Sequence, residues 1–246
     1  MDVLHMTEDA LEAQCIEWRR WFHEHPEVST EEKNTSEKIF HILKDLGLDP
    51  VRGQGHYGVA ATITGNKPGP MVALRADMDA LSVKEDTGLP YASKNPGVMH
   101  ACGHDIHMTT LLETVLRLLR RKDEIQGSVR LLFQPSEELA PTGGARYMIK
   151  DGFLKDVKAV FGLHVWPNFV CGQIGVKPGA MMAGSDRIKV VIKGRTSHAG
   201  HPQEGIDAIM AAADFLQQVS HIVSRRPPST SAPSTGDPGT MWCRMK

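Results

Sequence analysis

Three apolar runs of this 246-residue sequence each end in side chains that can bind a metal ion or transfer a proton. The residues that follow these runs are Asp77 and Asp79, Glu137 and Glu138, and His164. In open α/β sheets, ligands bind beyond the carboxyl ends of the strands, where side chains from distant sequence positions converge. If the three runs are strands of one sheet, these carboxylates and this imidazole are therefore expected to meet.

The segment MHACGHDIH adds a thiol and three imidazoles at the start of an expected helix. Its candidate ligands are His100, Cys102, His104 and His107. A helix N-terminus lowers the pKa of a thiol and so favours the thiolate that binds metal. With the carboxylates, this is a mixed nitrogen, oxygen and sulfur ligand set that suits zinc or a neighbouring transition metal. The number of candidate ligands indicates two ions.

A pair of ions is suited to amide hydrolysis. Two ions roughly 3.5 to 4 Å apart can share a bridging water, lower its pKa and clamp a carbonyl group. Such a site also needs a base beside the water. The adjacent carboxylates of Glu137 and Glu138 can divide this work, one binding metal and the other moving the proton.

Taken singly, each of these residues also has a structural interpretation. An isolated Cys102 is most simply a small buried apolar residue, the glutamate pair a solvated turn, and His164 a core histidine. A second catalytic interpretation makes Cys102 a nucleophile with His100 or His104 as its base, as in a thiol hydrolase. Removal of metal distinguishes the two, because a cysteine nucleophile survives chelation.

The apolar spacing also predicts the elements that position these side chains. Helices are expected over residues 8–24, 31–46, 105–121, 143–150 and 205–223. Thr30 is the expected cap of the second helix, and Gly47 its left-handed terminating residue. Strands are expected over residues 58–64, 71–76, 128–133, 158–163, 173–176 and 187–193. The long irregular stretch over residues 77–99 is expected to be functional, as such loops usually are.

The alternation of strands and helices predicts an α/β fold, with a mixed sheet flanked by helices on both faces. The run at 187–193 differs, because it alternates apolar with polar residues as a half-exposed antiparallel strand does. We therefore expect residues 1–183 to form a metal-binding catalytic domain. Residues 184–224 are expected to form the first strand and helix of a smaller α+β domain.

Composition narrows the class of protein. The sequence is 41% hydrophobic and 23% charged, with 28 basic and 29 acidic residues. This near-neutral balance, without a block of like charges, predicts no nucleic-acid partner and no membrane surface, and favours a small-molecule substrate. The acidic start lacks the features of a secretory signal, and the four cysteines are far apart. A cytoplasmic location is therefore expected.

Six segments of the chain resemble a known family in the same order. They are HPE at 25–27, LRADMDAL at 74–81, MHACGHDIHM at 99–108, FQPSEE at 133–138, GLHVWP at 162–167 and SHAGHP at 197–202. The sequence resembles the hippurate hydrolase and indoleacetyl-amino-acid hydrolase group of N-acyl-amino-acid amidohydrolases. These are co-catalytic metalloenzymes related to aminoacylase and glutamate carboxypeptidase. The resemblance covers about residues 15 to 224.

The resemblance implies a role for each matched side chain. Metal ligands would be Cys102, His104, Glu138 and His164, binding two divalent ions (Zn, Mn, Co or Ni). Glu137 would be the general base and acid, and Asp79 an aspartate that orients the site. His198, in the smaller dimerisation or lid domain, would reach across a homodimer to stabilise the oxyanion of the partner's substrate. The implied reaction cleaves an N-acyl amino acid into a carboxylic acid and a free amino acid.

The resemblance ends where the composition changes. Residues 225–246 contain four prolines and six Ser or Thr but no Leu, Ile, Val or Phe, which predicts an aberrant or disordered tail. Family members continue further, to a final histidine ligand. A frameshift or truncation is one interpretation, and a truncated, inactive fragment or pseudoenzyme that at most binds metal is the alternative function. The acyl group, the amino acid and the physiological metal are not specified by the sequence.

Overall fold

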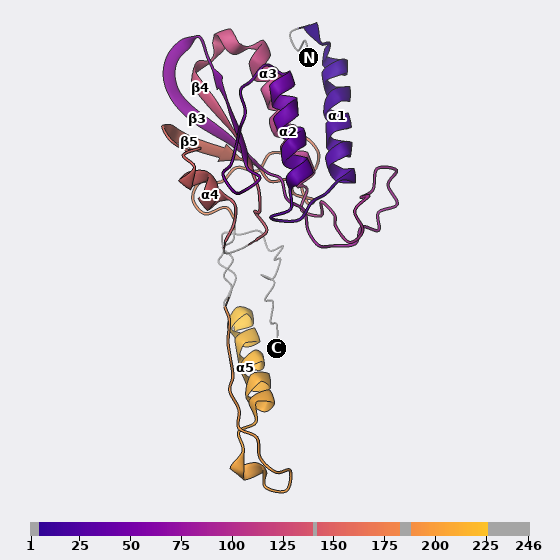
Figure 1. Cartoon of the computed structure of the whole chain (residues 1–246), viewed down its shortest axis with the longest axis vertical. Coiled ribbons are helices and arrows are strands. Elements are labelled where there is room, and N and C mark those ends of the chain that lie inside the picture. The colour runs from indigo at the N-terminus through magenta and orange to yellow at the C-terminus, as the bar shows by residue number, and fades with distance from the viewer. Residues whose placement is uncertain (1–4, 140–141, 183–187, 226–246) are drawn as a thin grey trace. The chain divides into compact units, whose positions relative to one another are not determined.

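The computed structural model describes residues 5–139, 142–182 and 188–225 (Figure 1). The chain divides into two compact units, Met1–Met181 and Met182–Lys246. The boundary expected at residue 184, the strand residue Arg187 and most of the expected tail lie outside the described residues. No described helix combines the length and the apolar content needed to cross a lipid bilayer.

A five-stranded mixed sheet forms the centre of the first unit. Its strands are β1 (Val51–Arg52), β2 (Val59–Thr64), β3 (Lys67–Asp77), β4 (Gln126–Gln134) and β5 (Val157–Gly162), in the order β1-β2-β4-β3-β5. β2 is antiparallel to both β1 and β4, whereas β3 runs parallel to β4 and β5. Asp77 pairs with Gln134, and Arg75 pairs with Gly162. The three parallel strands therefore end at nearly the same level.

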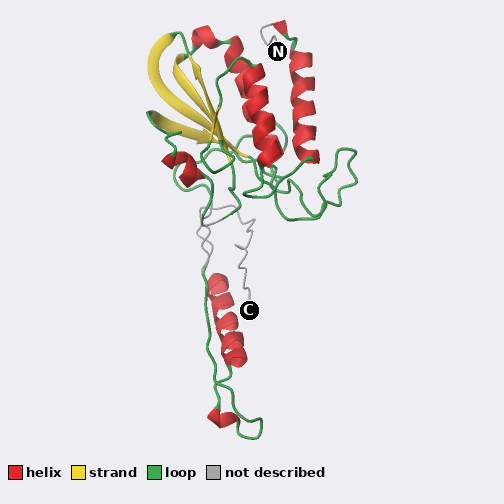
Figure 2. Cartoon of the chain, in the orientation of Figure 1, coloured by secondary structure: helices red, strands yellow, loops and turns green. Residues whose placement is uncertain are grey.

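Helices cover both faces of this sheet (Figure 2), which confirms the predicted fold class. One face packs against α1 (Glu8–Glu24), α2 (Lys33–Asp45) and α3 (His104–Arg120). Alternate strand residues on the opposite face pack against α4 (Ala145–Lys150). Ala61 and Leu131, for example, belong to the larger cluster, and their neighbours Ala60 and Leu132 to the smaller one. A short 3-10 helix, η2 (Lys122–Glu124), follows α3.

The ends of α2 test two predictions. Gly47 adopts a left-handed conformation (φ +78°), which confirms it as the terminating residue. Thr30 is not the cap, since the helix begins at Lys33 and the backbone of Thr30 is itself left-handed (φ +70°). The carboxylate of Glu27 instead accepts the N–H groups of Asn34 (3.1 Å) and Thr35 (2.8 Å). Glu27, which lies outside the helix, therefore accepts the free N–H groups of the first turn, as the side chain of a cap residue usually does.

Other expectations about strands were wrong. The apolar run at 158–163 predicts a strand covered by helices on both faces of the sheet, but β5 is an exposed edge strand, with Phe161 58% exposed. β1 was not predicted, because a two-residue strand leaves no periodic pattern. Neither residues 173–176 nor residues 188–193 form a strand, although both were predicted to do so.

The second unit contains the 3-10 helix η3 (Pro202–Glu204) and the helix α5 (Ala208–Arg225). An isolated antiparallel bridge joins Arg195 to Ile206. None of the unit's residues from 188 to 219 is buried. The helix α5 corresponds to the helix expected over residues 205–223, with both ends shifted by a few residues.

Candidate metal centre

Several of the candidate ligands lie at the carboxyl ends of the parallel strands, as the sequence predicts. Asp77 ends β3, the glutamate pair follows β4, and His164 lies two residues beyond β5. The long segment between β3 and α3 returns the chain to this end of the sheet, so that His104 is the first residue of α3. Because α3 begins at this end of the sheet, its first residue, His104, lies beside the strand ends.

His104 is the centre of this arrangement. It is fully buried, and its Nδ1 donates a hydrogen bond of 2.8 Å to the backbone carbonyl oxygen of Asp79. Its Nε2 is also buried but has no hydrogen-bond partner among the described residues. A buried polar atom without a partner is costly, whereas a ring held through its other nitrogen is the usual arrangement of a metal-binding histidine.

Metal-binding atoms surround this free nitrogen. Cys102 and His164 form one group with His104, and Glu137 and Glu138 form another, with all ligand atoms of a group within 4.8 Å of one another. The His104 Nε2 atom is 3.8 Å from Glu138 Oε1 and 3.9 Å from Glu137 Oε2. The Cys102 Sγ atom is 3.3 Å from His164 Nε2. The structure therefore brings the four ligands that the resemblance implies close to Glu137, the expected general base.

The chemistry of these side chains suits a divalent transition metal. A thiol, two imidazoles and two carboxylates supply the sulfur, nitrogen and oxygen ligands that zinc and its neighbours accept. The unpartnered Nε2 of His104 lies within reach of both groups. The side chain of Glu137 is 41% exposed, so that a small molecule can approach the site from solvent.

His107 is a candidate ligand whose two ring nitrogens are both engaged elsewhere. Its Nδ1 lies 2.6 Å from Asp77 Oδ1, and its Nε2 accepts the backbone N–H of Val165 at 2.9 Å. Val165 directly follows His164, whose own Nδ1 lies 2.6 Å from the Val165 carbonyl oxygen. Asp77 and His107 are geometrically able to bind metal with His104. Their hydrogen bonds instead fix the segment that carries His164.

Asp79 is fully buried and has hydrogen bonds with residues of the site. Its Oδ2 accepts hydrogen bonds from the Ser29 hydroxyl (2.7 Å) and from the backbone N–H of Glu138 (3.0 Å). Its carbonyl oxygen holds His104. Asp79 thus contacts both a predicted imidazole ligand and the backbone of a predicted carboxylate ligand.

The charges of the site shift the pKa values of its members. Burial lowers the pKa of His104, but contacts with Asp79, Cys102 and Asp77 outweigh this and raise it to about 11. Burial, and then the charges of Glu138 and Asp77, raise the pKa of Glu137 above its usual range. The interaction with His104 lowers the pKa of the Cys102 thiol, but burial and the charge of Glu138 leave it raised overall. The lowered thiol pKa expected from the helix N-terminus is therefore not found, although a bound cation would favour the thiolate.

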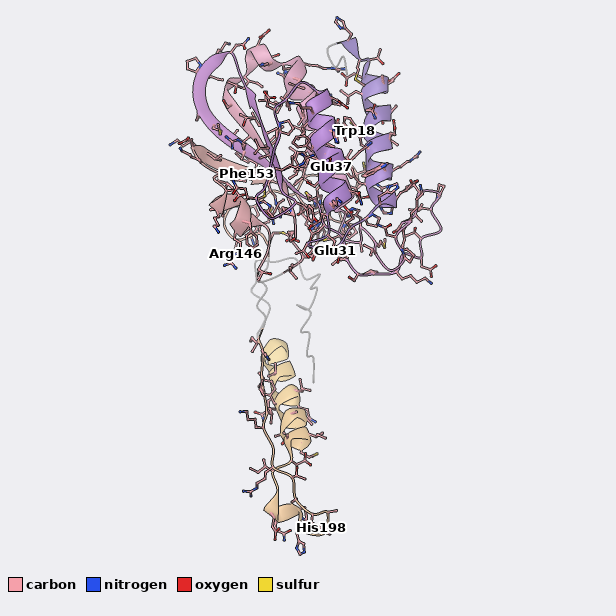
Figure 3. The ribbon with its side chains drawn as sticks, viewed as in Figure 1. Trp18, Glu31, Glu37, Arg146, Phe153 and His198 are labelled. Atoms are coloured by element: carbon pink, nitrogen blue, oxygen red, sulfur yellow. The ribbon has the colours of Figure 1, made fainter. Side chains whose placement is uncertain are left out.

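His198 belongs to the second unit, where its side chain is exposed (Figure 3). Its Nδ1 accepts the backbone N–H of Gly200 at 3.1 Å. A neutral imidazole whose Nδ1 is an acceptor carries its proton on Nε2. His198 therefore presents an N–H donor that no described protein group uses.

Three further residues were not predicted from the sequence. Glu32 is fully buried and accepts the backbone N–H of Ser136 at 2.6 Å. Glu27 caps α2, and His23 bridges Asp105 and Glu85. No pattern in the sequence assigns these contacts, because the partners of the three residues lie 7 to 104 residues away in the chain.

Comparison with known proteins identifies the family of this chain. The model of the peptidase family M20/M25/M40 matches residues 73–244. The chain is 44% identical over 221 residues to an N-acetylcysteine deacetylase of Bacillus subtilis, covering 89% of this chain and 58% of the relative. It is 42% identical over 217 residues to an N-acyl-L-amino acid amidohydrolase of Geobacillus stearothermophilus, covering 88% of this chain and 58% of the relative.

A solved structure shows the same similarity. The Bacillus subtilis YXEP protein, a dinuclear metal-binding peptidase from the M20 family, superposes with a TM-score of 0.67 at 43% identity. The match covers 70% of this chain and 48% of that protein. The chain spans little more than half the length of the curated relatives it matches. The family match extends over more than half of this sequence, and the chain accordingly belongs to the peptidase family M20/M25/M40.

Proposed function

We propose that this chain contains the metal centre of a hydrolase that cleaves the amide bond of N-acyl amino acids. The observation that carries the proposal is the buried Nε2 of His104, which has no hydrogen-bond partner in the described part of the chain and lies close to a thiol, an imidazole and two carboxylates. The names of two similar proteins support the substrate class, since one is an N-acetylcysteine deacetylase and the other an N-acyl-L-amino acid amidohydrolase.

Two divalent ions would be held by Cys102, His104, Glu138 and His164. When bound, such a pair lowers the pKa of a water molecule and polarises an amide carbonyl. The remaining work belongs to the side chains. The carbonyl oxygen of Asp79 holds the Nδ1–H of His104, which leaves Nε2 as the atom that can bind metal once its proton is displaced, and the Asp79 carboxylate holds the backbone of Glu138.

Glu137 is the proposed general base and acid. In this proposal its carboxylate takes a proton from the attacking water and passes it to the nitrogen of the departing amino acid. Its raised pKa suits this double role, because a proton acceptor that must also act as a donor works best with a pKa close to the working pH. The products are a carboxylic acid and a free amino acid.

His198 is proposed to donate its Nε2–H to the carbonyl oxygen as negative charge develops there. Its free donor supports this role, and one such donor is worth on the order of 10²-fold or more in rate. Following the family resemblance, the donor would come from a second copy of the chain in a homodimer. Residues 1–183 would then form the catalytic domain and residues 184–224 the start of the dimerisation or lid domain.

A second candidate function is a thiol hydrolase. The sequence offers His100 or His104 as its base, but the imidazole nitrogen that lies 3.3 Å from Cys102 Sγ is Nε2 of His164. This distance favours His164 as the base, since a nucleophilic cysteine needs a base within hydrogen-bond reach. The two proposals differ in their requirement for metal. A third possibility is a chain that binds metal but does not catalyse turnover, since the chain spans only 58% of the length of a similar deacetylase.

The test is release of free amino acid from N-acetyl, N-benzoyl and N-indoleacetyl amino acids, with Zn, Mn, Co or Ni added to chelator-treated chain. We expect turnover that requires metal and that falls by roughly 10² to 10⁴ in Glu137→Gln. Turnover that persists in chelator but disappears in Cys102→Ser would instead establish the thiol hydrolase. Metal binding without turnover of any substrate would overturn the proposed activity for this chain.

A further inference from the structure

The turn that carries the glutamate pair has an unusual backbone. Ser136, between the end of β4 and Glu137, adopts a left-handed conformation with φ +52°. Thr30 (φ +70°) contacts it directly, since its N–H donates to the Ser136 hydroxyl oxygen at 2.9 Å. Two of the three non-glycine residues with positive φ in the described chain therefore touch each other here. Such conformations persist only where the surrounding contacts hold them, and they cluster at functional sites.

Glu32 supplies the contacts that hold this turn. It is fully buried, and its Oε1 accepts both the backbone N–H of Ser136 (2.6 Å) and the Ser136 hydroxyl (3.1 Å). Its second carboxylate oxygen has no hydrogen-bond partner among the described residues. A buried carboxylate is costly to maintain, and this one directs a single oxygen at a single residue of the turn.

A second buried carboxylate holds the other side of the same turn. Asp79 Oδ2 accepts the N–H of Glu138 at 3.0 Å. The N–H groups that precede and follow Glu137 by one residue are thus both fixed by buried acceptors. The backbone of Glu137 lies between them, which restricts the directions in which its side chain can point.

We propose that Glu32 is a positioning residue, which holds the Ser136 turn so that the Glu137 carboxylate faces His104 and the substrate. This inference rests on the proposed function for the role of Glu137. Among the described residues, the side chain of Glu32 has hydrogen bonds only with Ser136 and none with a predicted ligand. A displacement of about 1 Å at a reacting group can reduce a rate by about 10²-fold, so the loss of this contact is expected to appear in kcat.

Two substitutions of similar length distinguish positioning from simple packing. Glu32→Gln keeps an oxygen at the Oε1 position, where it can still accept both hydrogen bonds of Ser136. Glu32→Met fills the same space without an acceptor. The neighbouring Glu31 is exposed, and no hydrogen bond joins its side chain to Ser136 among the described residues, so Glu31→Met is the matched control.

The first measurement is hydrogen exchange of the backbone amides of residues 136–138 in the full chain without metal. We expect Glu32→Met to increase exchange there by at least about tenfold, and Glu32→Gln and Glu31→Met to leave it within about threefold of the unsubstituted chain. The melting temperature and the exchange of α3 amides identify a variant that is merely unfolded. This measurement does not require activity, so it tests whether Glu32 holds the Ser136 turn even if the proposed function is wrong.

The second measurement is kcat and KM for the N-acyl amino acid that the unsubstituted chain hydrolyses. We expect Glu32→Met to lower kcat by about 10- to 100-fold with KM changed less than about threefold, and Glu32→Gln to restore most of kcat. Unchanged exchange at residues 136–138 in Glu32→Met overturns the inference. So does a loss of kcat that is equally large in Glu32→Gln, since the acceptor would then not be the cause. An inactive unsubstituted chain refutes the proposed function alone, and the exchange result then stands as the test of the contact.

Discussion

Two buried histidines beside the metal centre have opposite hydrogen-bonding environments. His107 uses both ring nitrogens, donating to Asp77 and accepting from the backbone of Val165. His100 is equally buried, yet neither of its ring nitrogens has a partner among the described residues. Burial lowers the pKa of His100 to about 4, so it is neutral. Only His107 is therefore able to hold the segment that carries His164.

This difference predicts that only one of the two histidines supports metal binding. We expect His107→Leu to weaken the affinity for Zn or Co by about 10- to 100-fold, the usual effect of losing a residue that orients a ligand. His100→Leu is the matched control, with a similar buried position and no hydrogen bond to lose. Calorimetric titration with each metal measures both variants. Equal losses of affinity in the two variants would contradict the proposed role of His107.

At the scale of elements, His23 joins three separate segments. Its Nδ1 is 2.7 Å from Asp105 in the first turn of α3, and its Nε2 is 3.2 Å from Glu85 in the loop after β3. All three side chains are at most 5% exposed. The hydrogen bond with Asp105 raises the pKa of His23, so the folded chain favours the imidazolium. Burial raises the pKa of Asp105, but the hydrogen bond with His23 outweighs it and leaves the pKa lowered. Burial also raises the pKa of Glu85, but hydrogen bonds from Thr87 and the Ser93 backbone, and then from His23, leave it lowered.

The direction of these shifts predicts how stability depends on pH. A raised histidine pKa contributes stability fully below its unfolded value of 6.5, and this contribution disappears as the pH rises through the folded value. The lowered carboxyl pKa values contribute stability above their unfolded values, 3.8 for Asp105 and 4.5 for Glu85, and this is lost as the pH falls through the folded values. The link formed by His23 is therefore strongest between about pH 5 and pH 6.5.

We expect His23→Gln to reduce the free energy of unfolding by about 2 to 3 kcal/mol near pH 6, as for the loss of hydrogen bonds to charged groups. The reduction should shrink as the pH is raised to 9. Urea unfolding of chelator-treated chain from pH 5 to pH 9 measures it. His41→Gln, at an exposed histidine on α2 whose side chain is 62% solvent-accessible, is the control and should change stability little. A reduction that grows toward pH 9 would refute this assignment.

The sequence predicted the elements that carry their own pattern and missed those that depend on distant partners. α1, α3 and β4 have periodic apolar residues, and their bounds differ from the prediction by at most two residues. The exposed edge strand β5 shows the limit, because an apolar run indicates a strand but not what covers it. Convergence of the ligands was also predictable, since it follows from parallel strands that end together. The positioning roles of Glu32 and His107 could not be predicted, because each depends on a partner 30 or more residues away in sequence.

At the scale of the whole molecule, the two units differ in how much surface they bury. The first unit contains the buried clusters on both sides of the sheet. In the second unit, no residue from 188 to 219 is buried, and apolar side chains of α5 such as Ile209 (81% exposed) and Met210 (60%) face solvent. An isolated helix of this length is only marginally stable in water, since most helical stability in proteins comes from packing of an apolar face. The second unit taken alone therefore lacks the burial that would stabilise α5.

Self-association through this apolar helix would supply the missing burial, and the dimer proposed above makes this testable. We expect amides of α5 to exchange within minutes at low micromolar chain concentration and to become at least about tenfold more protected at concentrations where sedimentation shows a dimer. Amides of α3, packed against the sheet, should show the same protection at every concentration and are the internal control. Ile209→Lys should abolish both the dimer and the concentration-dependent protection, because a charged side chain cannot be buried unpaired at low cost. Strong protection of α5 in a chain that sediments as a monomer would exclude dimerisation as the source of its stability, and with it the contribution of His198 from a second copy.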